Sequence, residues 1–212
     1  RGTAGQSLGA FAVRGLRLDV IGDGNDDVGK GLSGGMITIR PSPSASYVAE
    51  NNTIIGNTVL YGATSGLLLA NGQAGERFCV RNSGASAIVE GCGSNGCEYM
   101  TGGEVIILGK TGSNFGAGMT GGMAFIYDRD NNFLPKANPE TLHISKLSSG
   151  YWKDYLEERI GLHASETDSA LAKRLLNNWE VESEYFWHVV PTEVLGLLPQ
   201  PVSENEVAAQ SA

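Results

Sequence analysis

The sequence contains little cysteine, proline and basic charge, and it has no long apolar run. Three cysteines, Cys79, Cys92 and Cys97, are too few for a disulfide framework and favour a reducing compartment such as the cytoplasm. Because 15 Lys and Arg stand against 23 Asp and Glu, the net charge of −8 offers no basic surface for nucleic acid. No stretch approaches the ~20 apolar residues that span a bilayer, so we expect no membrane partner.

Glycine, in contrast, is abundant, with 30 of the 212 residues, which is about twice its usual share. Hydrophobic residues make up 41% of the chain, enough for a sizeable buried core, so the glycine excess does not indicate disorder. Collagen is excluded because the glycines have no three-residue period and proline occurs only 7 times. The glycines therefore need another structural reason.

A repeat of 19 residues supplies that reason. The phrase Met100-Thr101-Gly102-Gly103 returns as Met119-Thr120-Gly121-Gly122, and an apolar run follows each copy. An earlier copy at 32–35 is displaced by a turn-rich insertion near residues 41–51. Glycine is expected where the backbone needs positive φ, or where stacked turns leave no room for a Cβ atom. We expect this role for Gly34, Gly35, Gly84, Gly102, Gly103, Gly121 and Gly122.

The period predicts an all-β fold, a solenoid of parallel strands that makes about six turns over residues 1–130. Nineteen residues are too few for a helical-hairpin repeat or a propeller blade, and the frame of a leucine-rich repeat is absent. Leu69, Ile88, Ile107 and Ile126 recur at the same spacing. We therefore predict that these four side chains form one inward-facing ladder along the stacked turns.

Residues 131–212 read differently, as an extended linker and a two-helix tail. Apolar residues recur at helical spacing in 151–160 and in 168–179. Ser165 with Asp168 resembles a capping box at the start of the second helix. We expect the two helices to cover the open end of the solenoid or to dock on a neighbouring domain, and we expect 203–206 to fray.

The motifs that suggest chemistry have simpler explanations. A dinucleotide loop must open a helix, whereas the three G-x-G-x-x-G matches are followed by strands or by no helical pattern, so we interpret them as corners of the repeat. A phosphate-binding loop at Gly109-Lys110-Thr111 would need glycine at position 104, which is Glu104. The cysteines do not form an iron–sulfur ligand set, and His143, His163 and His188 are scattered, so that each is expected at the surface or in a docking contact. We predict no catalytic, cofactor-binding or metal-ligating residue in this chain.

Several longer phrases resemble the C-terminal domain of the glutamate synthase large subunit. They cover nearly the whole chain. The phrases are Gly5–Phe11, Asn25–Gly35, Gly62–Gly66, Gly75–Phe78, Val80–Ala85 and Gly96–Gly103. The resemblance implies a right-handed parallel β-helix, in agreement with the period.

The resemblance also implies a role within a larger flavoenzyme. In that family, an amidotransferase domain releases ammonia from glutamine, and a barrel domain with FMN and a 3Fe–4S cluster uses it to make glutamate from 2-oxoglutarate. Neither module is recognisable in this sequence, and the start at Arg1 suggests a piece of a longer chain, although removal of a leader would give the same start. The resemblance therefore implies a structural domain that docks on the amidotransferase and FMN-binding synthase domains. Its location would be the cytoplasm, or the plastid stroma in a photosynthetic eukaryote.

Other interpretations stay open. The chain could be a free-standing β-helix subunit of another oxidoreductase, such as formylmethanofuran dehydrogenase, which has a similar fold. A polysaccharide-binding solenoid is disfavoured because aromatic residues make up only 8% and lie mostly in the tail. Where many glutamate synthases close with a basic phrase, this chain has the apolar run Val194–Leu198, which favours the ferredoxin-dependent branch without deciding the electron donor.

Overall fold

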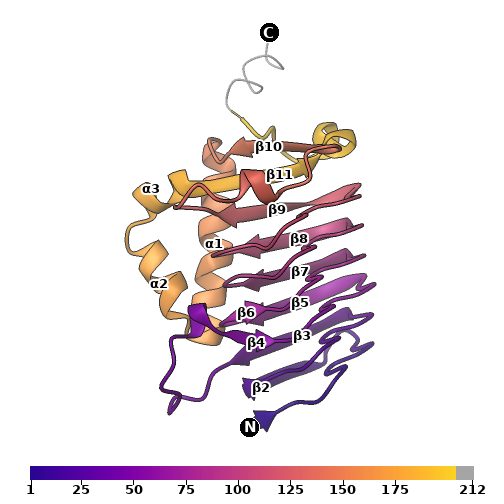
Figure 1. Ribbon diagram of the computed structural model, residues 1–212, viewed down its shortest axis with the longest axis vertical. Helices are drawn as coiled ribbons and strands as arrows, with labels where there is room; N and C mark the ends of the chain where they lie inside the picture. The colour runs from indigo at the N-terminus through magenta and orange to yellow at the C-terminus, as the bar shows by residue number, and fades with distance from the viewer. Residues whose placement is uncertain (204–212) are drawn as a thin grey trace.

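The computed structural model describes residues 1–203 and confirms the predicted parallel β-solenoid (Figure 1). Seven strands succeed one another in one sheet, and each pairs in parallel with the strand before it. They are β1 (Gly2–Thr3), β2 (Arg17–Asp23), β3 (Ser33–Arg40), β5 (Ser65–Ala70), β7 (Ser83–Val89), β8 (Thr101–Ile107) and β9 (Gly121–Tyr127). A second, two-stranded parallel sheet contains β4 (Thr53–Ile55) and β6 (Gln73–Ala74).

The turns stack through corners in which three alternate residues adopt the left-handed conformation, with φ between +53° and +72°. The first amide of a triplet bonds to the next turn and the middle amide to the previous one: Thr58 donates to Glu76 O at 2.9 Å, and Leu60 to Val28 O at 2.8 Å. These bonds stabilise a conformation that residues such as leucine otherwise disfavour. The triplets are Ser7, Gly9 and Phe11; Asp27, Gly29 and Gly31; Thr58, Leu60 and Gly62; Arg77, Cys79 and Arg81; Asn95, Cys97 and Tyr99; and Asn114, Gly116 and Gly118.

The length of a turn varies around the expected value. Between the middle residues of successive triplets, the chain advances by 20, 31, 19, 18 and 19 residues. The long step contains the segment between β3 and β4, where the sequence predicts an insertion, and the short helix η1 (Ala49–Asn51) lies within it. Two of the three G-x-G-x-x-G matches, at 29–34 and 116–121, begin in these left-handed corners and lead into strands.

The predicted single ladder is wrong at one step. Leu69 pairs with Ile88, and Ile107 pairs with Ile126, but Ile88 pairs with Ile106. The pairing of β7 with β8 is irregular between Ser83 and Ser86, so that the turn is one residue shorter there. Because side chains alternate along a strand, a shift of one residue moves them to the opposite face of the sheet. Leu69 and Ile88 therefore lie on one face, and Ile107 and Ile126 on the other.

The sheet is consequently buried on both faces. The inner face encloses a core that includes Ile37, Val89 and Ile107, and the outer face carries Leu69, Ile88, Ile106 and Phe125. Strands buried on both sides read as continuous apolar runs rather than as an alternation, which hides the change of face in the sequence.

The helix α1 (Gly150–Thr167) covers the outer face and runs along the stack behind the strands (Figure 1). Its buried residues Trp152, Leu156 and Ile160 pack against the outer core. At 18 residues it is about 27 Å long, enough to cross about five strands. The expectation that this helix covers the open end of the solenoid is therefore wrong.

The start of the second helix also differs from the prediction. Ser165 lies inside α1, and Asp168, with φ 59°, ends that helix instead of opening the next. The N-cap of α2 (Ala170–Leu176) is Ser169, whose hydroxyl accepts a hydrogen bond from Ala172 N at 3.0 Å. The predicted segment extends beyond α2, and its last residue, Trp179, begins a separate short helix, α3 (Trp179–Glu182).

The tail adds two strands that the sequence did not predict. β11 (Phe186–Pro191) pairs antiparallel with β9, and β10 (Leu142–Lys146) pairs antiparallel with β11. The short helices η2 (Leu134–Lys136), η3 (Ser183–Tyr185) and η4 (Thr192–Leu197) connect these elements. No helix in residues 1–203 is long and apolar enough to cross a membrane. The fraying expected at 204–206 lies outside the described residues.

Candidate functional site

The glycines singled out in the sequence lie where successive turns touch. A Cβ atom at Gly121 would lie 2.1 Å from the carbonyl oxygen of Thr101 in the preceding turn, a distance that real Cβ atoms do not reach. The same kind of carbonyl contact, at 2.2 to 2.6 Å, exists for Gly84, Gly102, Gly103 and Gly122. Gly34 and Gly35 are less crowded, since the nearest atoms would be 3.1 and 3.2 Å away, but Gly34 has a φ of +116°. These positions hold the turns together and present no ligand-binding group.

A buried carboxylate attaches α1 to the sheet. Glu104 on β8 is only 4% exposed, and it accepts a hydrogen bond from Arg159 Nε at 2.9 Å and another from the hydroxyl of Tyr155. Burial, together with the neighbouring carboxylate, raises the pKa of Tyr155, so this phenol stays protonated. The cluster fixes the position of the helix on the outer face.

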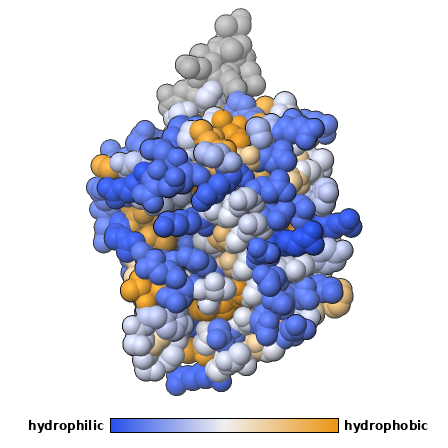
Figure 2. Space-filling model, in the orientation of Figure 1, coloured by the Kyte–Doolittle hydropathy of each residue, from blue (hydrophilic) through white to orange (hydrophobic). Residues whose placement is uncertain are grey.

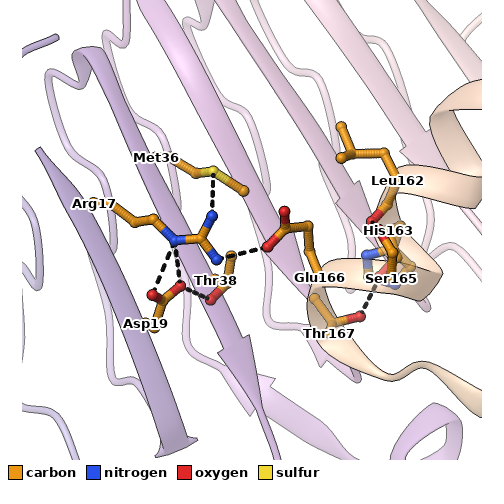
Figure 3. Close-up of polar contacts among 9 residues, drawn as sticks. All are labelled: Arg17, Asp19, Met36, Thr38, Leu162, His163, Ser165, Glu166 and Thr167. Atoms are coloured by element: carbon orange, nitrogen blue, oxygen red, sulfur yellow. Dashed lines mark hydrogen bonds and ion pairs between the residues drawn. The ribbon is translucent and has the colours of Figure 1, made fainter. Parts of the chain in front are cut away.

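A second polar attachment joins the C-terminal end of α1 to β2, near the N-terminal end of the solenoid (Figure 3). There the guanidinium of Arg17 donates to Asp19 at 2.9 Å and to Glu166 of α1 at 2.6 Å. The hydroxyl of Thr38 donates to the same Asp19 carboxylate at 2.7 Å. The Arg17 guanidinium holds the pKa of Asp19 below its usual range, so the carboxylate stays charged at neutral pH.

Two of the three histidines belong to the core, which corrects the expectation of surface or docking roles. His163 and His188 are both fully buried. His188 stacks on Phe125 with ring centroids 4.4 Å apart, and burial lowers its pKa to about 3, so it is neutral at physiological pH. His163 Nε2 lies 3.7 Å from the buried Glu90 carboxylate, which also accepts a hydrogen bond from Ser169 at 2.5 Å.

The cysteines do not fit a cluster or a nucleophile. Cys79, Cys92 and Cys97 are buried and unpaired with one another. Burial raises the pKa of all three thiols, that of Cys92 to about 12, whereas ligation and attack need the thiolate. Within residues 1–203, no group of three His, Cys, Asp or Glu side chains could hold a metal ion. The residues present therefore do not fit the iron–sulfur cluster of the resembled family.

A cleft of about 720 Å³ opens between α2, the insertion and the segment after β9. Gly109–Thr111 form part of its wall. Four of its charged side chains form two ion pairs, Arg174 with Glu50 at 2.8 Å and Arg129 with Glu182 at 3.1 Å. Lys136, which also lines the cleft, donates to the carbonyl oxygen of Thr111 at 2.9 Å. We assign no ligand to this cleft.

The N-terminal end of the solenoid is open. The inward side chains of its first turns, Leu8, Leu18 and Val20, are partly exposed, and three apolar side chains beside them lie mostly in solvent. The latter are Phe11 at 69%, Val13 at 59% and Leu16 at 45% exposure. The face seen in Figure 2, in contrast, is largely hydrophilic, with apolar residues in small separate patches. Exposed apolar side chains beside a partly exposed core favour a contact with another part of a protein at this end.

The stacked left-handed corners, with a Gly-rich strand start after each, define the class of protein. The chain belongs to the family described by the GXGXG motif, whose model matches residues 1–192. The corner triplets share the alternate-residue spacing of such a motif, and their middle and last residues are both glycine in the turns at 27–31 and 114–118.

The relatives within this class are glutamate synthases. The chain is 58% identical to the NADPH-dependent glutamate synthase large chain of Azospirillum brasilense over 95% of this chain and 13% of that protein. It is 50% identical to the ferredoxin-dependent glutamate synthase of Pyropia yezoensis, over 90% of this chain and 12% of the relative. A ferredoxin-dependent enzyme of Arabidopsis thaliana, named chloroplastic/mitochondrial, is 48% identical over 90% of this chain and 12% of its own length.

These relatives distinguish a part of a glutamate synthase from a free-standing subunit of another oxidoreductase. They do not support a free-standing subunit of another oxidoreductase, because the chain spans only about an eighth of the glutamate synthases that it matches. They include both NADPH- and ferredoxin-dependent enzymes, so they do not decide the electron donor.

The sequence missed the groups that attach the tail to the sheet. Glu104 is a charged residue in the otherwise apolar outer column of β8, Glu90 directly follows the apolar strand β7, and each has a partner in the tail. A carboxylate in such a strand is rarely buried without a partner. That signal identifies the two positions as attachment points, although it does not identify the partners.

Proposed function

We propose that this chain is the C-terminal structural domain of a glutamate synthase large subunit, docked on the amidotransferase and FMN-binding synthase domains of the same polypeptide. One observation carries the proposal: 95% of the chain matches a glutamate synthase large chain at 58% identity, while spanning 13% of its length. In this proposal, the other domains make glutamate from glutamine and 2-oxoglutarate and hold FMN and the 3Fe–4S cluster. The subunit would work in the cytoplasm or in a plastid stroma.

The architecture suits a rigid spacer. The sheet is buried on both faces, the turns are bonded through every corner, and the helix α1 is attached to strands near its middle and near its C-terminal end. Attachments at β8 through Glu104 and at β2 through Arg17 prevent the helix from sliding along the stack. Such a body transmits the position of one contacting domain to another with little deformation.

The test compares two rates in the full-length subunit. Glu104→Ala leaves the Arg159 guanidinium without its buried partner, which should loosen α1 from the sheet. We expect the ratio of glutamine hydrolysed to glutamate formed to rise above that of the parent enzyme. Glu157→Gln, on the exposed side of the same helix, is the matched control and should leave the ratio unchanged.

Two results would contradict the proposal. One is a Glu104→Ala subunit whose α1 exchanges amide hydrogens faster while the two rates stay coupled. The other is turnover by the isolated chain: glutaminase activity, glutamate formation or stoichiometric flavin absorbance in residues 1–212 alone would make this domain catalytic.

A further inference from the structure

The first turn of the solenoid lacks the cover that every later turn has. The inward positions of β2 are occupied by Leu18 and Val20, which are partly exposed. One turn later, the residues that pair with them, Ile37 and Ile39, are completely buried. The two strands pair in a regular register. The difference in side-chain exposure between β2 and β3 therefore comes only from the preceding strand that most of β2 lacks.

The backbone at this end is open as well. β1 covers only Gly22 and Asp23 of β2, so Arg17–Ile21 have a paired strand on one side only. In the corner, the amide of Gly9 corresponds to those of Gly29 and Leu60, which bond to the preceding turn. Within residues 1–203, the Gly9 amide has no acceptor. Unpaired backbone groups in this arrangement are a template for another extended segment.

The edge carries none of the features that usually prevent such pairing. β2 contains no proline, and its pairing with β3 has no bulge. Of its three charged residues, Asp23 lies in the part that β1 covers, and Arg17 and Asp19 point to the outer face, where Arg17 is held by Glu166 (Figure 3). They therefore do not project over the free edge, which is held flat and in register.

The register of β1 specifies what would complete this edge. Gly2 pairs with Gly22 and Thr3 with Asp23, a displacement of 20 residues. Continued backwards, the same register places Arg1 opposite Ile21 and the four residues before Arg1 opposite Val20 to Arg17. The relatives are about eight times longer than this chain, which spans 13% and 12% of them, so they contain the polypeptide that could supply such residues.

We propose that the segment directly before Arg1 in the longer subunit extends β1 by four residues along β2, with apolar side chains at its first and third positions before Arg1, facing Val20 and Leu18. The proposal rests on the proposed function only in requiring that this chain be part of a longer subunit. The segment buries the apolar end of the inner core and pairs the free amides and carbonyls of β2.

Hydrogen exchange in the full-length subunit tests the proposal. The amides of residues 17–21 that do not bond to β3 should exchange within about ten-fold of the rates of the paired amides in β3. Exchange about a hundred-fold or more faster than in β3 would show an uncovered edge and overturn the proposal. Polar residues at both the first and third positions before Arg1 would overturn it too.

A pair of variants tests the apolar contact. In the full-length subunit, Val20→Thr, which replaces an inward methyl by a hydroxyl, should speed the exchange of β2 about ten-fold or more. Ile21→Thr is the control on the outer side of the same strand and should change it less than about two-fold. Equal effects would contradict an inward apolar contact.

The remaining outcomes are also decisive. Protection of β2 that appears only with dimerisation of the subunit would assign the edge to a second copy, against the proposal. If β2 is protected but the ratio of glutamine hydrolysed to glutamate formed does not change when α1 is loosened, the proposed function is contradicted and this inference stands. If that ratio does change when α1 is loosened but the amides of β2 exchange rapidly, the proposed function stands and this inference is contradicted.

Discussion

At the C-terminal end of the solenoid the chain reverses direction, so that β11 and then β10 lie beside the last parallel strand, whereas at the N-terminal end β2 has two residues of β1 beside it. The inner core is correspondingly closed at one end by Phe115, Phe133 and Leu142 and exposed at the other through Leu18 and Val20. A parallel stack does not terminate itself, because each turn offers the next the same hydrogen bonds that it accepts from the previous one. An antiparallel strand ends this repetition, whereas an uncovered parallel strand can still pair with a further turn.

The largest expected effect compares one inner column at two depths. Ile107 lies in the middle of the stack, and Val20 lies in the same column at the open end. Ile107→Asp buries a carboxylate without a partner and should cost about 4 kcal/mol or more, enough to prevent folding. Val20→Asp should cost only about 1 kcal/mol in the 212-residue chain, because water reaches that side chain.

Urea titration of both variants measures the difference. Equal losses of stability would mean that the two positions are equally buried and that the open end is closed in solution. In the full-length subunit, the cost of Val20→Asp should rise toward that of Ile107→Asp.

An intermediate effect concerns contacts between turns. Gly121→Val would place a Cβ atom 2.1 Å from Thr101 O, so the two strands would have to separate, at a cost of about 3 kcal/mol. Gly62→Ala is the control, because no atom lies within 4 Å of its Cβ position and only the left-handed φ of +65° is disfavoured. We expect about 1 kcal/mol for this control. Thermal melts that ranked the two variants in the opposite order would contradict close stacking as the reason for glycine.

The smallest effect is a pH dependence at the closed end. The folded protein holds the pKa of His188 at about 3 because the side chain is buried, whereas the unfolded chain has the usual value of about 6.5. The unfolded state therefore binds the proton first, and stability is lost as the pH falls below about 6.5. His188→Phe keeps a ring that stacks on Phe125 and removes the titration.

Between pH 6.5 and pH 5, the parent should lose about 2 kcal/mol more than the His188→Phe variant. Denaturant titrations at the two pH values give this difference. Parallel loss in both proteins would place the acid sensitivity in other groups.

The glycine phrases were sufficient to predict the solenoid, because close stacking and positive φ restrict the choice of residue at the corners. The same pattern could not reveal the one-residue step between β7 and β8. Both Ile106 and Ile107 are apolar, and either could continue the column of Ile88, so only the pairing itself distinguishes them. The predicted ladder failed at the one place where strands buried on both faces make two registers look alike.

The tail was less predictable for a different reason. The helical spacing that identified α1 is local, whereas β10 and β11 depend on partners that lie far away in the sequence. Ser169 rather than Ser165 caps α2, because Asp168 takes the left-handed conformation that ends α1. The attachment sites Glu104 and Glu90 were visible as charges within or directly after apolar strands, but their partners Arg159 and Ser169 follow from the packing of the helices.

The alternating corner amides have a consequence for how such a protein can change in length. Each corner donates one amide hydrogen bond to the next turn and another to the previous turn, so the corners of neighbouring turns must stay aligned. The addition or loss of part of a turn would therefore leave unpaired backbone groups on both sides of a corner. Chain length can therefore vary by complete turns, by single residues between two corners, as in the step from β7 to β8, or by excursions that leave and rejoin the stack at the same level, as the segment before β4 does.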